Sequence, residues 1–290
     1  MATLQDTRRR VVSTQNTHKI TKAMEMVAAA KLRRAQQRIE ALRSYALSMI
    51  DMMQDLARYA ESPTLYPLLR RHDAVRDITL VVFTGDRGLA GAFNANVLRR
   101  ATEVYRQVTA EGQSVHWVVI GKKGIGTLRF RGYQLDRTWE GLSDHPDYTH
   151  AEEIARHLIE QYTSEKTDEV HLIYNRFRSP LEQTVKDVVR LPIEPPEVRR
   201  GGQLPATYIY EPDPGIIYEQ LLPRYVDITV FRALLESSAS EQGARMTAMR
   251  NASENADEMI DHLTLQLNRA RQQSITQEIL EVVAGANALG

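Results

Sequence analysis

Two glycine-rich segments have the composition of a ligand-binding loop. Residues 84–91 are TGDRGLAG and residues 121–126 are GKKGIG, and each follows a short apolar run. Glycine-rich turns between a strand and a helix can cradle phosphate groups with their backbone N–H groups. Neither segment has the Gly-Lys-Ser/Thr ending of a phosphate loop or the spacing of a dinucleotide-binding fingerprint. Nucleotide binding stays an alternative to the simpler interpretation that glycine serves the backbone of the turns.

Other residues that could do chemistry form no convincing constellation. His145 and His150, with Asp144 and Asp147, have side chains that can ligate a metal, but Pro146 between them favours a polar loop. The sequence has no G-x-S-x-G elbow. We therefore predict no catalytic residue, no cofactor and no metal site.

The composition limits the class of protein. The chain has 290 residues, of which 42% are hydrophobic and 26% charged, and it has no cysteine, which excludes disulfides and thiolate metal sites. No apolar run approaches the roughly 18 residues that a membrane span needs. The charged N-terminal segment lacks the apolar core of a signal peptide. These features predict a protein of one or two structural units that does not itself cross a membrane.

The formal charge is zero overall but unevenly distributed. Residues 1–43 hold ten Lys and Arg against three Asp and Glu, whereas residues 216–290 hold six against ten. Such a basic segment suits nucleic acid, an acidic protein surface or an acidic neighbouring helix. Nucleic-acid binding is the least favoured of the three, because no aromatic residue is interleaved with the basic ones before Tyr45.

The middle of the chain alternates between strand and helix patterns, which predicts a Rossmann-like α/β domain of the doubly wound kind over residues 75–208. The short apolar run at 78–83 is typical of a strand buried on both faces. Further strands are expected at 115–120, 169–174 and 184–191, and helices at 92–111, after 126 and at 151–163.

Both ends of the chain predict long helices. The N-terminal segment, residues 1–60, predicts one helix from Leu4 to about Tyr59. The C-terminal segment, residues 209–290, predicts another, which covers the stretch from about Arg224 to Gly290 and has Pro212 and Pro214 near its start. Alternating steps of three and four residues define an apolar seam on each helix. The first seam is Ala28, Leu32, Ala35, Ile39, Leu42, Ala46, Met49, Met53 and Leu56; the second is Met246, Met249, Ser253, Ala256, Ile260, Leu263, Leu267 and Ala270.

The two seams predict that the two helices form a long antiparallel coiled coil. The α/β domain is then inserted in the chain between these two helices. Upstream of Ala28 the apolar residues Ile20 and Met24 are four apart, so a slip in the heptad register is expected there. The C-terminal helix is the longer one, so one of its ends should extend past its partner. A coiled-coil adaptor is the alternative function that this pattern leaves open.

Several stretches resemble the γ subunit of F-type ATP synthase, of the bacterial type. They are ITKAMEMVAAAKLRRAQ (20–36), TGDRGLAGAFN (84–94), YEPDP (210–214) and the two C-terminal runs ASEQGARMTAMRNASENADEMI and NRARQQSITQEILEVVAGANAL. They occur in the order of the family and extend over the whole chain.

The resemblance implies a non-catalytic rotor shaft, present in one copy per complex, that transmits torque between the proton-driven c-ring and the catalytic α3β3 ring. Its partners would be the α and β subunits, the ε subunit and the c-ring, without nucleic acid. It would reach the cytoplasmic face of the bacterial cell membrane only through the complex. The absence of cysteine excludes the dithiol control of the chloroplast branch.

The resemblance also implies three sets of contact residues. Contacts with the β subunit are expected for Lys22, Met24, Glu25, Gln242, Arg245, Arg271, Gln272 and Thr276. Contacts with the hydrophobic sleeve at the top of the ring are expected for Ile279, Leu280, Val282 and Val283. Contacts with the c-ring or ε are expected for Tyr210, Glu211 and Asp213. An acidic lever of the β subunit would complement the basic N-terminal helix.

Overall fold

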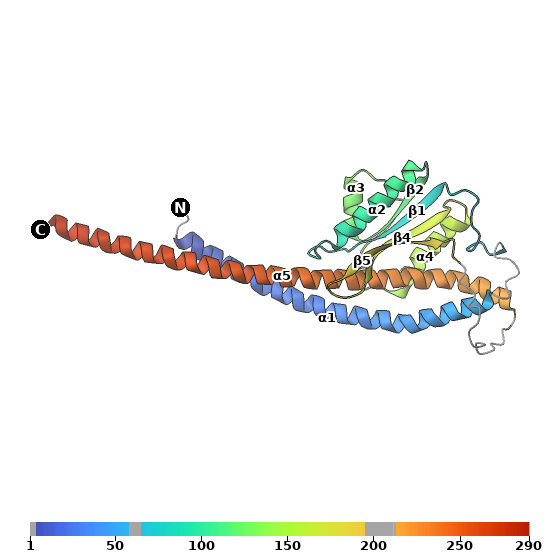
Figure 1. Ribbon diagram of the computed structural model, residues 1–290, viewed down its shortest axis with the longest axis horizontal. Coiled ribbons are helices and arrows are strands. Elements are labelled where there is room, and N and C mark those ends of the chain that lie inside the picture. Colours follow the sequence, from blue (N-terminus) through green and yellow to red (C-terminus); the bar gives the residue numbers. More distant parts are fainter. Residues whose placement is uncertain (1–3, 58–64, 195–210, 212, 290) are drawn as a thin grey trace. The chain divides into compact units, whose positions relative to one another are not determined.

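The computed structural model describes residues 4–57, 65–194, 211 and 213–289. The chain forms two compact units, one of residues 1–28 and 245–290 and the other of residues 29–244. Helix α1 (Leu4–Leu56) and helix α5 (Pro214–Leu289) each contribute to both units (Figure 1). None of the helices in the described part of the chain has an apolar stretch of the length that crossing a membrane requires.

The second unit contains a five-stranded sheet with the order β3-β2-β1-β4-β5. Its strands are β1 (Asp77–Phe83), β2 (Ser114–Ile120), β3 (Arg137–Trp139), β4 (Glu169–Phe177) and β5 (Gln183–Leu191). The first four are parallel and β5 is antiparallel to β4. All four expected strands are present, and β3 is an additional three-residue edge strand that was not predicted.

Helices cover both faces of this sheet, as the doubly wound pattern predicts. Helices α2 (Phe93–Ala110) and α3 (Lys122–Phe130) pack on one face, where Leu80, Val82 and Val119 point into a shared apolar cluster. Helix α4 (Tyr148–Thr163) packs on the other face with parts of α1 and α5. Successive residues of β1 point to opposite clusters, so the strand is buried on both sides.

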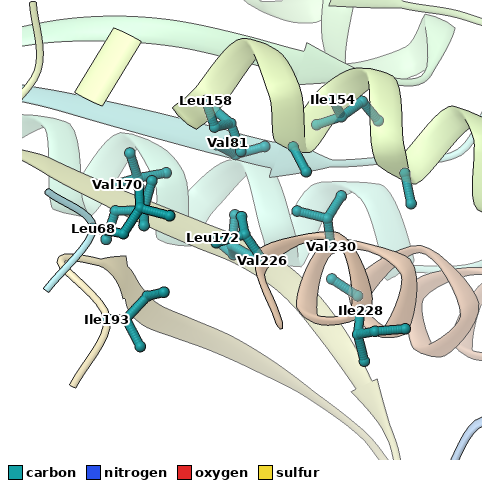
Figure 2. Close-up of a cluster of buried hydrophobic side chains, with 14 of the residues drawn as sticks. Leu68, Val81, Ile154, Leu158, Val170, Leu172, Ile193, Val226, Ile228 and Val230 are labelled. Carbon is teal, nitrogen blue, oxygen red and sulfur yellow. The ribbon is translucent and has the colours of Figure 1, made fainter. Parts of the chain in front are cut away.

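The larger cluster joins the sheet to the second unit's part of α5. Figure 2 shows Ile154 and Leu158 of α4 above Val81 and Leu172 of the sheet, with Val226 and Val230 of α5 beside them. Burial of this kind stabilises a fold by roughly 25 cal/mol per Å² of apolar surface. The sheet domain and this part of α5 therefore share one hydrophobic core.

Helix α5 begins at Pro214, ten residues before Arg224 and within the segment that was expected to lead into the helix. Asp213 Oδ1 accepts hydrogen bonds from the backbone N–H groups of Gly215 and Ile216, at 2.8 and 3.2 Å, which caps the helix. Pro214 occupies the first helical position, where a missing N–H costs little. Pro223 lies inside the helix, and the buried neighbour Leu222 anchors this turn in the core. The expectation that Pro214 lies near the start of this helix is therefore confirmed.

The first unit is an antiparallel pair formed by residues 4–28 of α1 and 245–289 of α5. Thr14 contacts Met259, His18 lies 3.2 Å from Asp257, and the hydroxyls of Thr21 and Ser253 share a 2.7 Å hydrogen bond. As the residue number rises along α1, the number of its partner on α5 falls. An antiparallel coiled coil is thus present in this unit, but the seam of residues 246–270 faces residues 4–28 of α1. The expectation that it pairs with the seam from Ala28 to Leu56 was wrong, because only Ala28 of that seam lies in this unit.

The expected register slip near Met24 was wrong. Ile20 is 60% exposed, whereas Thr21 and Glu25 are buried. The inward positions of this stretch keep the steps of four and three without a break; they are Thr7, Val11, Thr14, His18, Thr21, Glu25 and Ala28, all buried or half-buried. The seam continues through polar residues, which an analysis based on apolar residues alone does not detect.

Candidate functional site

The first glycine-rich turn is held together by Asp86. Its Oδ1 accepts from the backbone N–H groups of Lys122 and Gly141, both at 3.0 Å, and its Oδ2 accepts from Ser143 N at 3.1 Å. Partial burial works against ionisation, but these donors outweigh it and hold the pKa of the Asp86 carboxyl below its usual range. Asp86 thus ties together three loops at the carboxyl edge of the sheet.

The second turn is packed too tightly for a phosphate. Gly121 has a φ of 96°, and a Cβ there would lie 2.1 Å from the carbonyl oxygen of Thr84. The Thr84 hydroxyl accepts from Gly124 N at 2.9 Å, and the N–H of Lys122 is taken by Asp86. The first N–H groups of α3, which would face a phosphate, already have protein partners. This geometry favours the structural interpretation of both glycine-rich turns over nucleotide binding.

The histidine and aspartate cluster also has structural partners. Asp147 caps α4, and its backbone N–H donates to His150 Nδ1 at 3.2 Å. Asp144 forms an ion pair with Lys31 at 3.0 Å and one with Arg87 at 3.4 Å. Among the described residues, no group of three His, Asp or Glu side chains is placed to hold a metal ion.

A buried polar segment of α5 docks against the loops of the sheet domain. Ser238 Oγ donates to Ser143 O at 2.7 Å, and Ser240 Oγ donates to Asn175 O at 3.0 Å. A Cβ on Gly85 would lie 2.7 Å from the carboxyl carbon of Glu241, so glycine allows the first turn to approach α5. Close packing between helix and loop explains the small and hydroxyl side chains at these positions.

In the first unit, Glu25 is the centre of a charged cluster. It is 8% exposed, and its two carboxylate oxygens accept from Lys22 Nζ and Arg250 Nε, both at 3.0 Å. The hydrogen bond from Lys22, followed by that from Arg250, holds the pKa of the Glu25 carboxyl below its usual range. Lys22 and Glu25 were among the contact residues predicted from the sequence, but Arg250 was not, because its partner lies 225 residues away.

The other residues expected in this zone differ in accessibility. Met24 is half-buried in the first unit, and Arg245 of the same unit is 7% exposed. Gln242 belongs to the second unit, where its Nε2 donates to Asp144 Oδ1 at 3.2 Å, and it is also buried. Arg245 and Gln242 therefore present little surface, whereas Lys22 is about half exposed.

The far part of α5 is exposed along its length. Continuing the antiparallel pairing, Leu4 falls roughly opposite Ala270, and residues 275–284 are all exposed. Arg271 and Gln272 are exposed, and Thr276 Oγ1 donates to Gln272 O at 2.9 Å. The four apolar residues expected to meet a sleeve are 51–72% exposed; they are Ile279, Leu280, Val282 and Val283. A contiguous apolar group on a helix surface is a common mark of a protein interface.

The third expected contact set lies at the start of α5. Glu211 and Asp213 are exposed, and Asp213 has the capping role described above. Tyr210 lies outside the described residues.

Solved structures with the same fold come from rotary ATP synthases. One, from the central stalk and c-ring of the Tetrahymena thermophila mitochondrial enzyme, is 28% identical, with a TM-score of 0.60 over 81% of this chain and 99% of that one. Another, from an OSCP/F1/c-ring structure of the Euglena gracilis mitochondrial enzyme, is 19% identical, with a TM-score of 0.68 over 99% of this chain and 94% of that one. The fold, an α/β domain between two long terminal helices, is that of a central-stalk protein.

Sequence comparisons define the family. The ATP synthase family model matches residues 3–289. The ATP synthase gamma chain of Desulforamulus reducens is 46% identical over the full length of both chains, and that of Moorella thermoacetica is 45% identical over the same share. The chain belongs to the ATP synthase gamma chain family.

Proposed function

We propose that this chain is the rotor shaft of a bacterial ATP synthase and transmits torque between the c-ring and the α3β3 ring. The observation that carries this proposal is the pairing of the two terminal helices in the first unit of a chain that the ATP synthase family model matches over residues 3–289. The two helices are joined by side-chain contacts such as the hydrogen bond between Thr21 and Ser253. A coiled coil of two helices held together in this way resists twisting better than a single helix. Torque can therefore pass along it.

The chain would work without catalysing a reaction, in one copy per complex, with α, β, ε and the c-ring as partners. The occupied N–H groups of the two glycine-rich turns support a structural role for the residues that most resemble a phosphate site. It would be peripheral, at the cytoplasmic face of the membrane. No cofactor or nucleic acid is part of this proposal.

Contact with the β subunit would use two zones of the first unit and, in addition, Gln242 of the second unit. One is the cluster around Glu25, in which Lys22 offers an exposed cation to an acidic lever, with Met24 and Arg245 beside it in sequence or pairing, and Gln242 one turn before Arg245 along α5. The other is the exposed polar group of Arg271, Gln272 and Thr276. Both zones would bias the conformations of the β subunits as the shaft turns.

The apolar group at residues 279–283 would lie in the hydrophobic sleeve of the ring, which explains how its side chains can be exposed in the isolated chain. Glu211 and Asp213, with Tyr210, would approach the c-ring and ε. In this arrangement residues 1–60 and 209–290 form the shaft, and residues 75–208 form the domain that it carries.

The double substitution Arg271→Ala with Gln272→Ala tests the second zone. Loss of two exposed polar contacts should cost about 1–2 kcal/mol, so ATP hydrolysis by the assembled complex should fall roughly five- to thirtyfold. Both residues are exposed, so the fold of this chain should be unchanged.

Arg106→Ala with Gln107→Ala is a matched control, because it removes the same two residue types from the exposed face of α2. The control complex should hydrolyse ATP at the wild-type rate. Equal rates in all three fully assembled complexes would contradict the contact assigned to Arg271 and Gln272.

A further inference from the structure

An open groove of about 800 Å³ lies between α2 and α3 in the second unit. The two helices pack on the same face of the sheet (Figure 1) and run in the same direction, because each connects one parallel strand to the next. One wall is the face of α2 from Asn94 to Arg106, and the other contains Lys123, Thr127 and Arg131, which are four residues apart. None of the lining residues belongs to the contact sets of the rotor function proposed above.

The two helices that form the groove are strongly basic. Helix α2 contains three arginines and one glutamate, and α3 contains two lysines, one arginine and no acidic residue, although the formal charge of the whole chain is zero. Four exposed cations line the groove; they are Arg99, Arg106, Lys123 and Arg131. A solvated helix face commonly alternates charges of both signs, and this one does not.

The positive charge of the groove is not compensated within the chain. Among the residues that the structure describes, no carboxylate forms an ion pair with any of the four cations; Arg99 donates instead to the neutral Asn96 Oδ1, at 2.6 Å. Glu103 is the one carboxylate that lines the groove, and its charge is already met by Arg100 at 3.8 Å. A concave surface with an excess of one charge attracts a partner of the opposite charge.

The spacing of the cations decides which anion fits. Arg99 and Arg106 are seven residues apart, about 10 Å along α2, and Lys123 and Arg131 are eight residues apart, about 12 Å along the axis of α3. Carboxylates that are seven residues apart on an α-helix repeat at about the same distance. Phosphates follow one another at about 3.4 Å along each strand of a DNA duplex, so most of them would meet no cation in this groove.

The floor of the groove also disfavours nucleic acid. The ring of Tyr133 is half-buried and packs on Tyr105 and Trp117, with centroids 5.0 and 5.2 Å away, so it is poorly placed to stack on a base. The hydroxyls of Thr102 and Thr127 donate to carbonyl groups of their own helices. The cations are therefore the groups with which the groove can hold an anion, and their spacing selects a helix.

We propose that this groove binds an acidic helical segment of a partner protein, in the manner of a helix in a groove. Two rows of carboxylates, each repeating every seven residues, would pair with Arg99 and Arg106 on α2 and with Lys123 and Arg131 at α3. This partner is not the α3β3 ring, so the control Arg106→Ala with Gln107→Ala, which concerns ATP hydrolysis by the complex, is unaffected.

The test measures binding of a fluorescein-labelled peptide to the full-length chain by fluorescence anisotropy. The probe is three repeats of AQQAEQE, whose glutamates form two rows on opposite flanks of its alanine face. At about 0.1 M ionic strength, charges more than about 10 Å apart are largely screened, so contacts within the groove dominate. The probe should bind saturably, and the same peptide with glutamine in place of every glutamate should not. No binding of the probe, or equal binding of the two peptides, would overturn the proposal.

Charge reversal within the groove tests the location. Arg99→Glu with Lys123→Glu places a repulsive charge in each wall and should weaken binding of the probe at least about tenfold. Arg129→Glu with Lys166→Glu is the matched control, because it reverses the same two residue types at exposed positions outside the groove. The control should keep the wild-type affinity. Equal losses in the two variants, both folded by circular dichroism, would show that only overall charge attracts the probe and would refute the groove.

Two further probes test the kind of partner. A proline in place of the central alanine keeps the charge of the peptide and interrupts its helix, so the cost of ordering the segment should weaken binding at least about tenfold. A labelled single-stranded DNA heptamer, whose six phosphates match the charge of the probe, should bind more weakly than the intact peptide. Equal binding of the proline peptide, or tighter binding of the DNA, would contradict the assignment to a helical protein segment.

Discussion

The carboxylate of Asp86 is the part of the fold whose removal gives the most specific prediction. In Asp86→Asn, the remaining side-chain oxygen can still accept from Lys122 and Gly141, because both bonds end on Oδ1. The new NH₂ group takes the place of Oδ2 and faces the N–H of Ser143, so a donor meets a donor. The substitution keeps the shape of the side chain and changes only its charge and hydrogen bonding.

The magnitude follows from the bonds that are weakened. Hydrogen bonds to a charged group contribute about 1.5–3 kcal/mol, against about 1 kcal/mol for neutral ones. Two bonds lose their charge and the third is lost entirely, so the free energy of unfolding should fall by roughly 2–4 kcal/mol. This is a large share of the roughly 5–15 kcal/mol that stabilises a typical domain.

The assay is urea unfolding of the full-length chain, followed by tryptophan fluorescence. The two tryptophans, Trp117 and Trp139, lie in β2 and β3, so the signal reports on the second unit. Asp73→Asn is the matched control, because Asp73 is exposed and none of the described side chains bonds to it. The control should unfold within about 0.5 kcal/mol of the wild type.

The pH dependence follows from the lowered pKa of Asp86. Because the folded pKa lies below the unfolded value, the carboxylate stabilises the fold fully above about pH 4, and the contribution is lost as the pH falls through the folded pKa. The difference between wild type and Asp86→Asn should be constant between pH 5 and 7 and should shrink below pH 4. Equal stability of Asp86→Asn and Asp73→Asn at pH 7 would refute the role given to Asp86.

Three further substitutions test other parts of the structure. Gly121→Ala should destabilise the second unit by at least about 3 kcal/mol. Gly126 has open space around it, so Gly126→Ala should instead stabilise α3 by about 0.5–1 kcal/mol. Unfolding followed by tryptophan fluorescence compares the two variants. Burial opposes the charging of His171, but Asp187 and Glu169 outweigh it and raise its pKa, so its stabilisation is full below about pH 6.5 and is lost as the pH rises through the folded pKa. The stability difference between wild type and His171→Gln should therefore be smaller at pH 9 than at pH 6, and an increase would contradict this. Thr21→Val removes the hydrogen-bond partner that lies 2.7 Å from Ser253, so the free energy of unfolding should fall by about 1 kcal/mol. The double substitution with Ser253→Ala should lower it by less than the sum of the two single substitutions. Additive losses, measured from helix melting by circular dichroism, would disprove the coupling.

Much of the fold was predictable because its elements have strong periodicity. The apolar run of β1 and the heptad seam from Ala28 to Leu56 depend on local sequence spacing alone. Strand β3 has only three residues and follows a loop, so it has no period to detect. The start of α5 near Pro214 could be predicted, because the Asp213–Pro214 pair carries the signature of a helix start.

The polar half of the seam could not be predicted from apolar spacing. Thr21 and Glu25 are suited to the inside of a coiled coil only because Ser253 and Arg250 lie opposite them. Those partners are more than 220 residues away in sequence, so the compensation appears only once the two helices are paired. The same holds for Asp86, whose three donors lie in loops 36 to 57 residues further along the chain.

Contacts with other subunits depend on surfaces that this chain does not contain. The resemblance to the gamma chain family supplied Arg271 and the apolar group at 279–283 as candidates. The exposure of these residues is compatible with an interface, and the burial of Gln242 and Arg245 limits what they can offer a partner.

Rotation of the chain within an assembled complex is the most direct test of the shaft function. The chain has no cysteine, so Thr109→Cys, at an exposed position near the end of α2, gives one attachment point for a bead. The α3β3 ring, assembled with this variant and fixed to a surface, should turn the bead in one direction when ATP is added, and the bead should stop when ATP is removed. ATP hydrolysis by intact complexes whose beads do not rotate would contradict the proposal that this chain is the rotor shaft.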